Sequence, residues 1–265
     1  MGKHAEREEA ILSVLRCRSQ ITTFEAIDLL NVSESTARRL FNDLVEKGKA
    51  IRQYGGIRLA QNSAYEYSFE RLMDENAEEK QAIANKAVEF ISDHDIIFFD
   101  SGTTVYRLCL ALAEKIKSGA LSDITVFTNS SSNLQPLAEV CEVTLVGGKY
   151  RPKRMDFAGF SANKFISNFN FTKAFLGTDA VNIADGFMTT DTDTAMTTEL
   201  VIERSDTIIV LADAGKIGRR SFMSYAKPQD IDVLVTSMGA DMQVVEKLRK
   251  TGTKVLTVNP KITER

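Results

Sequence analysis

The feature that most constrains this chain is an alternation of strand-like and helix-like segments through its last two hundred residues. Short apolar runs recur there, and segments with apolar residues three or four apart separate most of them. This alternation predicts an α/β domain with a mostly parallel sheet, because a parallel connection needs a long crossover that is usually a helix. The expected strands are 96–99, 124–128, 143–146, 173–176, 207–212, 233–236 and 254–258, and the expected helices are 78–92, 104–117, 133–141, 194–204 and 241–251.

The first sixty residues follow a different pattern, in which three short helices precede a hairpin. Thr22 stands three residues before Glu25, which is capping-box spacing, and Gly55-Gly56 marks a turn. Three helices and a glycine-tipped hairpin within sixty residues predict a winged helix-turn-helix. The expected helices are 6–17, 24–30 and one that begins after Ser33 or Ser35, and the expected strands are 49–52 and 57–60.

The outer face of the third helix has side chains suited to a DNA major groove. Arginine binds guanine, asparagine binds adenine, and hydroxyl groups reach phosphates. The helix residues expected to contact DNA are Ser33, Ser35, Thr36, Arg38, Arg39 and Asn42. On the hairpin the expected contacts are Arg52, Tyr54, Gly55 and Arg58. The opposing interpretation is an ordinary solvated helix surface, and only the complete arrangement argues against it.

The net charge differs between the two parts of the chain. The whole chain has a formal charge of −3, which by itself argues against nucleic-acid binding. Residues 1–60 contain ten Lys and Arg against eight Asp and Glu, whereas the remaining residues contain twenty-three against twenty-eight. The acidic total therefore belongs to the larger domain and does not exclude DNA binding by the smaller one.

Other composition features favour a cytoplasmic protein. The three cysteines, Cys17, Cys109 and Cys141, are far apart in the sequence, as is typical of reduced thiols. No apolar run approaches the roughly 20 residues of a membrane helix, and the charged N-terminus does not resemble a signal peptide. The histidines and cysteines show no metal-ligand spacing, so we expect no metal site and no cofactor.

Small and polar residues follow the predicted strands at their carboxyl ends, where parallel sheets bind ligands. The run 100–104 leads into a helix, whose free N–H groups and dipole favour an anion. Lys216 offers a point charge, and Asp100, Asn129 or Asp179 can bind hydroxyl groups, so a small phosphorylated polyol fits. The expected effector residues are Asp100, Ser101, Gly102, Thr103, Thr104, Thr128, Asn129, Gly147, Gly148, Lys149, Arg151, Asp179, Asp213 and Lys216.

The chain resembles the DeoR-type bacterial transcriptional regulators at both ends. In the N-terminal part the resemblance rests on Val32-Ser33-Glu34-Ser35-Thr36-Ala37-Arg38-Arg39-Leu40, Leu44–Gly48 and Tyr54-Gly55-Gly56. The chain departs from the family pattern at Ala37, at Leu40-Phe41 where Asp-Leu is usual, and at Tyr54, which replaces histidine. These departures affect contacts to the DNA backbone or the choice of operator, and they preserve the apolar stripe.

The larger part resembles the sensor domain of the same regulators. The motifs are Asp100–Thr104, Thr128-Asn129, Gly147-Gly148, Phe175–Gly177 and Leu211–Lys216, in that order. The resemblance implies a fold similar to ribose-5-phosphate isomerase, a homo-oligomer (dimer or tetramer), and repression of sugar-catabolism genes that a sugar phosphate relieves. Ser237 stands where the family often has an acid, so the resemblance implies no acidic side chain with a role at this position.

These inferences divide the chain into a winged helix-turn-helix at 1–60, a linker at 61–75 and an α/β sensor domain at 76–265. The alternating aromatic residues Tyr65, Tyr67 and Phe69 favour an extended linker docked on the sensor domain. The expected partners are double-stranded operator DNA and a phosphorylated sugar, with no membrane.

Two other functions stay open at this point. The first is a sugar-phosphate isomerase or deaminase with a DNA-binding appendage, because Asp100, Asp179, Asp185 and Asp213 supply carboxylates, although spacing alone shows no general base within reach of a substrate. The second is a nucleotide-binding protein, but neither G-x-x-x-x-G-K-[ST] nor G-x-G-x-x-G occurs in the chain. A ligand-controlled regulator is the prediction that uses both parts of the chain.

Overall fold

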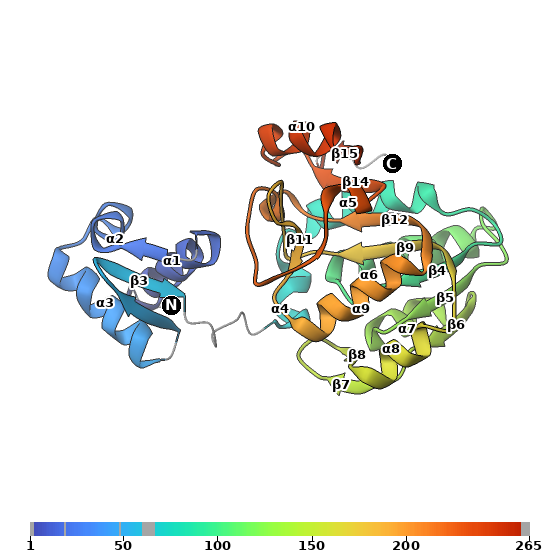
Figure 1. Cartoon of the computed structure of the whole chain (residues 1–265), viewed down its shortest axis with the longest axis horizontal. Helices are drawn as coiled ribbons and strands as arrows, with labels where there is room; N and C mark the ends of the chain where they lie inside the picture. The colour runs from blue at the N-terminus through green and yellow to red at the C-terminus, as the bar shows by residue number, and fades with distance from the viewer. Residues whose placement is uncertain (1–2, 19, 48, 60–66, 261–265) are drawn as a thin grey trace. The chain divides into compact units, whose positions relative to one another are not determined.

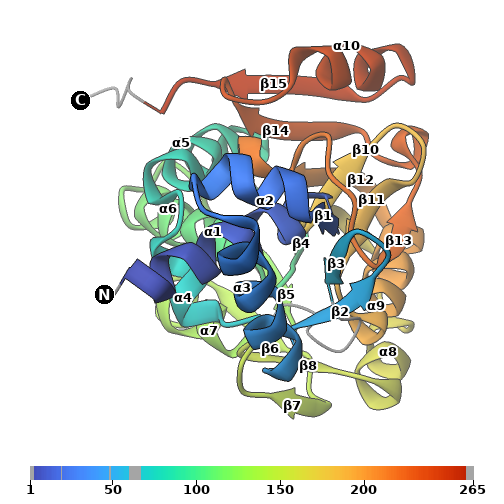
Figure 2. The ribbon, with the colours of Figure 1, turned by 90° about the vertical axis from the view of Figure 1, so that its left-hand side faces the viewer.

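The computed structural model describes residues 3–18, 20–47, 49–59 and 67–260 and divides the chain into two compact units, with the boundary between Glu66 and Tyr67. No helix among these described residues is long and apolar enough to cross a membrane. The N-terminal unit consists of α1 (Lys3–Arg18), β1 (Gln20–Thr22), α2 (Thr23–Leu30), α3 (Glu34–Glu46), β2 (Ala50–Gln53) and β3 (Gly56–Leu59), as Figure 2 shows in blue.

Local side-chain bonds fix the helix-turn-helix. The backbone N–H of Glu25 donates to Thr22 Oγ1 at 3.2 Å, and the Glu25 carboxylate accepts from the backbone N–H of Thr22 at 2.8 Å, which completes the capping box. Asn31 ends α2 in the left-handed conformation with φ 47°, and Ser33 caps α3. The apolar stripe of α3 then packs into the core of the unit, in which the helix side chains Ile11, Leu15, Leu40, Phe41 and Leu44 are buried.

The sequence did not suggest the short strand β1, which enters the sheet beside β3 and gives the order β1-β3-β2. Gly56 is opposite Thr22 in this pairing, and a Cβ at Gly56 would lie 2.1 Å from the carbonyl oxygen of Ile21. Only glycine therefore lets the hairpin approach β1 this closely.

We expect Gly56→Ala to destabilise the N-terminal unit by about 1–3 kcal/mol, because the backbone must move to relieve the overlap. Chemical denaturation followed by circular dichroism would measure the effect. Gly147→Ala is the matched control, since a Cβ there has no neighbour within 4 Å and the residue has no positive φ. Equal stability of both variants would show that β1 does not pack on the hairpin as described.

The larger unit is built on a seven-stranded sheet with the order β15-β14-β12-β9-β4-β5-β6, in which all neighbours are parallel. The mostly parallel sheet predicted from the alternation is confirmed. The strands are β4 (Ile96–Phe99), β5 (Thr125–Thr128), β6 (Glu142–Leu145), β9 (Phe171–Gly177), β12 (Ser205–Leu211), β14 (Val233–Ser237) and β15 (Lys254–Val258).

Helices cover both faces of this sheet (Figure 1). Alternate residues of each strand enter separate cores, so that Ile97 and Phe99 pack on one side and Phe98 on the other. The first core includes residues of α5 (Ala77–Ala87), α6 (Thr103–Lys117) and α7 (Ser131–Leu137), and the second includes residues of α8 (Phe160–Ile166), α9 (Thr192–Glu203) and α10 (Met242–Lys250). Burial on both faces explains why the strands are continuous apolar runs.

Several elements of the larger unit were not predicted. They are α8, the hairpin of β7 (Lys149–Arg151) and β8 (Asp156–Ala158), and an antiparallel sheet of β10 (Ala180–Asn182), β11 (Gly186–Thr189) and β13 (Met223–Ala226). The hairpin follows the carboxyl end of β6 and contacts the loop after β4, since Ser101 donates to Asp156.

The prediction of an extended linker at 61–75 is wrong for its second half, which forms α4 (Phe69–Asp74). Ser68 caps this helix by accepting a bond from the backbone N–H of Arg71, and the ring of Phe69 packs edge-on against Tyr106 with the centroids 5.8 Å apart. The aromatic alternation resembled a strand, but the Ser68 cap and the burial of Phe69 decide the local structure. Residues 61–66 lie outside the described residues.

Candidate functional site

The strand order creates a switch point between β4 and β9. The chain adds β5 and β6 on one side of β4 and then returns to place β9, β12, β14 and β15 on the other. In parallel sheets, ligands bind at such a point, in the crevice beyond the carboxyl ends of the two strands. Asp100 and Gly177 meet at this point, since the N–H of Gly177 donates to Asp100 Oδ2 at 3.0 Å. Burial raises the pKa of Asp100.

Helix α6 begins at this crevice. Gly102 is its N-cap and supplies no side-chain hydrogen bond, so no side chain caps the first turn. Thr103 and Thr104 are buried in that turn. The helix dipole and the N–H groups of a fifteen-residue helix make this end favourable for an anion.

A buried ion pair joins the β7–β8 hairpin to the loop after β4. Arg151 donates to Asp156 through Nε at 2.7 Å and Nη2 at 2.6 Å, and Ser101 Oγ donates to Asp156 at 2.9 Å. Arg151 also pairs with Asp191 at 2.5 Å. Burial would lower the pKa of Arg151, but the two carboxylates raise it above its usual value. The two carboxylates thus already neutralise Arg151, which holds the hairpin in place.

Arg154, at the turn of the same hairpin, differs from Arg151 because it forms no ion pair with any residue that the structure describes. It donates to Thr190 Oγ1 at 2.8 Å, and Thr190 donates through both its backbone N–H and its hydroxyl to Asp179 Oδ2 at 2.9 and 3.0 Å. The hydroxyl of Thr189 donates to the same oxygen at 3.1 Å. Arg154 is therefore a cation beside the switch point that is available to an anion. Arg154 is not among the effector residues that the sequence predicts.

The loop after β5 contributes a buried acceptor. The amide nitrogen of Asn129 donates to the carbonyl oxygen of Phe157 at 3.1 Å, whereas Asn129 Oδ1 is buried without a hydrogen-bond partner. An unsatisfied buried acceptor costs about 1–3 kcal/mol, so this oxygen favours a donor from a ligand or water. Thr128 is fully committed within the protein, because its hydroxyl donates to Phe99 and accepts from Asn133.

A second polar cluster follows β12. Asp213 Oδ1 accepts from Asn76 Nδ2 at 3.2 Å and from the N–H of Gly215 at 3.1 Å. Lys80 is 4% exposed and donates to the carbonyl oxygen of Leu72. Burial lowers the pKa of Lys80 to about 8, although the negative charge of Asp213 opposes the shift. The sequence predicts Asp213 and Lys216 as effector residues but not Lys80, whose only signal is a charged residue on the inward face of α5.

The shifted pKa of Lys80 predicts a pH dependence of stability. Between pH 8 and 10.5 the unfolded chain binds the proton that the folded chain has released, so the free energy of unfolding rises with pH in that window. We expect wild type to gain on the order of 2 kcal/mol relative to Lys80→Met between pH 7.5 and 10. Urea denaturation at both pH values would measure the difference. A constant difference would show that Lys80 keeps its ordinary pKa.

The predicted effector residues occupy three places. The loops after β4, β5 and β9 converge at the switch point, and Arg151 reaches them through Asp156. Asp213 and Lys216 lie after the next strand, β12. Gly147, Gly148 and Lys149 follow β6, the edge strand three positions from β9, and lead into the β7–β8 hairpin. A Cβ at Gly148 would lie 2.8 Å from the carbonyl oxygen of Ala158, which explains this glycine by packing.

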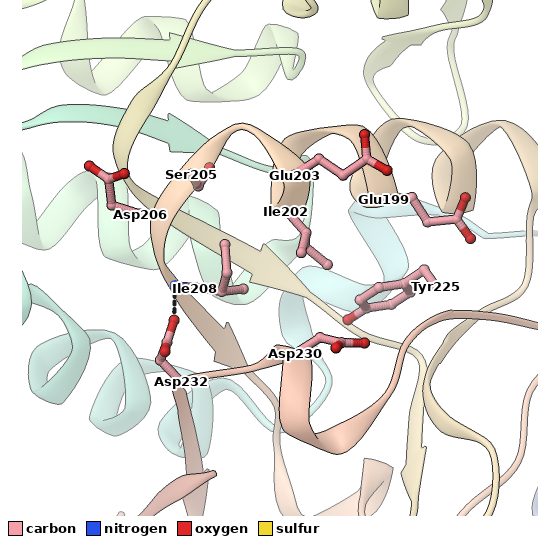
Figure 3. A pocket seen from close by; sticks show the side chains of 9 residues that line it. All are labelled: Glu199, Ile202, Glu203, Ser205, Asp206, Ile208, Tyr225, Asp230 and Asp232. Atoms are coloured by element: carbon pink, nitrogen blue, oxygen red, sulfur yellow. Dashed lines mark hydrogen bonds between the residues drawn. The ribbon is translucent and has the colours of Figure 1, made fainter. Parts of the chain in front are cut away.

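Figure 3 shows a cavity of about 460 Å³ elsewhere in the unit. Ser205 begins β12 and Asp232 precedes β14, so the cavity lies at the amino ends of these strands. Burial and the neighbouring Glu203 raise the pKa of Glu199. Five carboxylates line the cavity, and their charge disfavours a phosphate there. They are Glu199, Glu203, Asp206, Asp230 and Asp232.

In the N-terminal unit, α3 separates its buried stripe from a polar outer face. Ser33, Ser35, Arg38, Arg39 and Asn42 are exposed, and Thr36 is half-buried. The hydroxyl of Ser33 bonds with those of Ser35 at 3.0 Å and Thr36 at 2.9 Å. The hairpin tip presents Tyr54, which is fully exposed, beside Gly55 with φ 76°.

The arginines of this face are not equivalent. Arg38 pairs with Glu34 at 2.6 Å. Arg52 turns back onto α3, where it donates to Asn42 Oδ1 and to the carbonyl oxygen of Arg38, the latter at 3.3 Å. The amide oxygen of Asn42, a residue expected to contact DNA, is therefore already bound by Arg52. No ion pair is present for Arg39 among the described residues, so it is the arginine of α3 most available to DNA.

One cluster of metal-ligand type occurs among the described residues. His4 Nε2 lies 3.2 Å from Glu8 Oε1 and 3.2 Å from Asp43 Oδ2. Lys47 Nζ occupies the same Glu8 oxygen at 2.5 Å and lowers the pKa of Glu8. With an ammonium group at this oxygen, the cluster is a set of ion pairs that ties α1 to α3.

Two protein-family models match the chain. The DeoR-like helix-turn-helix domain matches residues 7–63, and the DeoR C terminal sensor domain matches residues 75–238. The regulator GlpR of Haloferax volcanii is 30% identical to this chain, and the match covers 95% of this chain and 97% of the relative. A putative aga operon repressor of Escherichia coli is 30% identical (96% of this chain, 94% of the relative), and a lactose phosphotransferase system repressor of Staphylococcus epidermidis is 32% identical (94% and 97%).

Two ribose 5-phosphate isomerases are among the solved structures that resemble the chain. A ribose 5-phosphate isomerase from Plasmodium falciparum matches with a TM-score of 0.40 and 19% identity, over 53% of this chain and 52% of that one. The enzyme from Methanocaldococcus jannaschii matches with a TM-score of 0.41 and 17% identity, over 54% and 55%. The likeness extends over about half of each chain.

Proposed function

Since the chain belongs to the DeoR family of transcriptional regulators, we propose that it represses genes of sugar metabolism and leaves its operator when a phosphorylated sugar binds the larger unit. The observation that carries the proposal is the uncapped start of α6 beside Arg154 at the switch point. The named relatives support it, because two of them are repressors of an aga operon and of a lactose phosphotransferase system.

The chemistry of the site favours a sugar phosphate over other anions. A phosphate needs N–H donors and a cation, which the α6 N-terminus and Arg154 offer. Sugar hydroxyl groups need acceptors, which the free Asn129 Oδ1 and the carboxylate of Asp179 offer. Lys216 and the buried Lys80 add positive charge at the neighbouring strand end.

An enzymatic function is not part of the proposal, because the matched relatives are named as regulators. The site geometry agrees with a binding role. Asp179 Oδ2 accepts three hydrogen bonds from Thr189 and Thr190. Asp100 Oδ2 is committed to the N–H of Gly177. Both carboxylates are thus held in place by the protein, as suits groups that orient a ligand.

Release by a ligand requires different ligand affinity in the DNA-competent and DNA-incompetent states. An even oligomer, as proposed here, would place paired helix-turn-helix units on two half-sites of a two-fold operator. A change in how these units are held would then weaken both half-site contacts together. We place this regulator in the cytoplasm, where it meets its DNA.

The DNA interface is tested with a duplex that the wild-type protein selects from a randomised pool. We expect Arg39→Ala to lower affinity for this duplex by about tenfold at fixed salt, because a specific arginine contact contributes about 1–3 kcal/mol. We expect a smaller loss for Arg38→Ala, since Glu34 already pairs with Arg38. Lys250→Ala removes the same charge from α10 and is the control. Equal affinities for Arg39→Ala and the control would contradict the assignment of α3.

The effector site is tested by thermal shift with ribose 5-phosphate, fructose 1-phosphate, fructose 6-phosphate, galactose 6-phosphate, glycerol 3-phosphate and inorganic phosphate. A compound at 100 times its dissociation constant should stabilise the protein by about 2.7 kcal/mol. We expect Arg154→Ala and Lys216→Ala to weaken that binding about tenfold and to leave DNA affinity unchanged. Lys164→Ala, at an exposed position on α8, is the control. Wild-type affinity in both site variants would refute the proposed site.

A further inference from the structure

Tyr67 is the first residue that the structure describes after the N-terminal unit, and its side chain lies against the switch-point site. The guanidinium carbon of Arg154 lies 4.3 Å from the centroid of the Tyr67 ring, which is a cation–π contact. The same guanidinium donates to Thr190, which in turn donates to Asp179. The ring of Tyr67 is therefore linked to the effector site by a short chain of direct contacts.

The charged groups of the site act on the hydroxyl of Tyr67. Its pKa is raised well above the usual value by burial and then by the negative charges of Asp179, Asp100 and Asp156, while Arg154 opposes the shift. These carboxylates belong to the loops after β4 and β9 and to the hairpin. The structure shows no hydrogen bond from this hydroxyl to another described residue, so it is available to a ligand.

The residues that follow Tyr67 are bound to the same two elements that form the site. The N–H of Phe69 donates to the carbonyl oxygen of Lys153 at 2.9 Å, next to Arg154 in the hairpin. The buried ring of Phe69 packs on Tyr106, in the first turns of α6. The segment Tyr67–Phe69 therefore contacts both the cation and the helix N-terminus that we assign to phosphate binding.

We infer that Tyr67 is an effector-contacting residue and that the segment Tyr67–Phe69 transmits occupancy of the site to the chain that leads to the DNA-binding unit. The inference rests on the proposed function. A phosphate that binds the N–H edge of Arg154 draws the guanidinium toward itself, because this charge-assisted bond is stronger than the cation–π contact that Tyr67 makes with the face of the same group. Ligand binding thus changes the Tyr67 contact at the point where the chain enters the sensor unit.

The chain has no tryptophan, so Tyr67→Trp places a single fluorescent reporter at the site. We expect its emission to change saturably with the sugar phosphate that stabilises wild type in the thermal-shift panel. Tyr150→Trp is the matched control, since Tyr150 lies on the same hairpin and is 46% exposed. Its emission should stay constant in the same titration.

Two further variants separate ligand contact from transmission. Tyr67→Phe keeps the ring over Arg154 and removes the hydroxyl, and we expect it to bind the sugar phosphate about fivefold more weakly, as for loss of one hydrogen bond. Tyr67→Leu removes the cation–π contact. We expect this variant to bind the selected duplex within twofold of wild type. Its release from DNA should nevertheless need at least tenfold more sugar phosphate than release of wild type, when each concentration is divided by that protein's own dissociation constant for the compound.

The results distinguish this inference from the proposed function. If a sugar phosphate stabilises wild type and releases DNA, but the Tyr67→Trp emission is constant and Tyr67→Leu is released like wild type, the inference is wrong and the proposed function stands. If no compound in the panel stabilises wild type or releases DNA, both fail together.

Discussion

The position of β9 beside β4 is the constraint on which the sensor unit depends. The first three strands of the sheet, β4, β5 and β6, extend in one direction, and all later strands are added on the other side of β4. At this reversal the loops after β4 and β9 are neighbours, and the N–H of Gly177 donates to the carboxylate of Asp100. The start of α6, the Asp179 loop and the Arg154 hairpin all meet at this crevice because the two strands are neighbours.

The two arginines of the β7–β8 hairpin differ in whether neighbouring carboxylates neutralise them. Arg151 is paired with both Asp156 and Asp191, and Asp156 also accepts from Ser101, so this arginine fixes the hairpin and has no positive charge left for a ligand. Arg154 is three residues away and is unpaired among the described residues, which leaves one guanidinium available at the mouth of the site. The two arginines of one short hairpin thus differ, since carboxylates hold Arg151 whereas Arg154 forms no ion pair with a described residue.

The same distinction applies in the DNA-binding unit. Arg38 and Arg52 are engaged by Glu34 and by Asn42, whereas Arg39 is the exposed cation of α3 without a described ion pair. The apolar stripe predicted which face of α3 is buried, and Leu40, Phe41 and Leu44 are indeed in the core. The stripe carried no information about which polar side chains on the outer face bind one another, because those contacts cross from the helix to the hairpin.

The sequence by itself determined the two kinds of domain, the strands of the parallel sheet and the capping of the helix-turn-helix at Thr22, because periodicity and capping are local properties of the chain. It also indicated the polar residues at the strand ends. Only the tertiary structure decided which strand ends are neighbours, and it placed Gly147, Gly148 and Lys149 after the edge strand β6. It likewise brought Lys80, Arg154 and Tyr67 to the strand ends, since strand order and the docking of α4 depend on contacts between residues far apart in sequence.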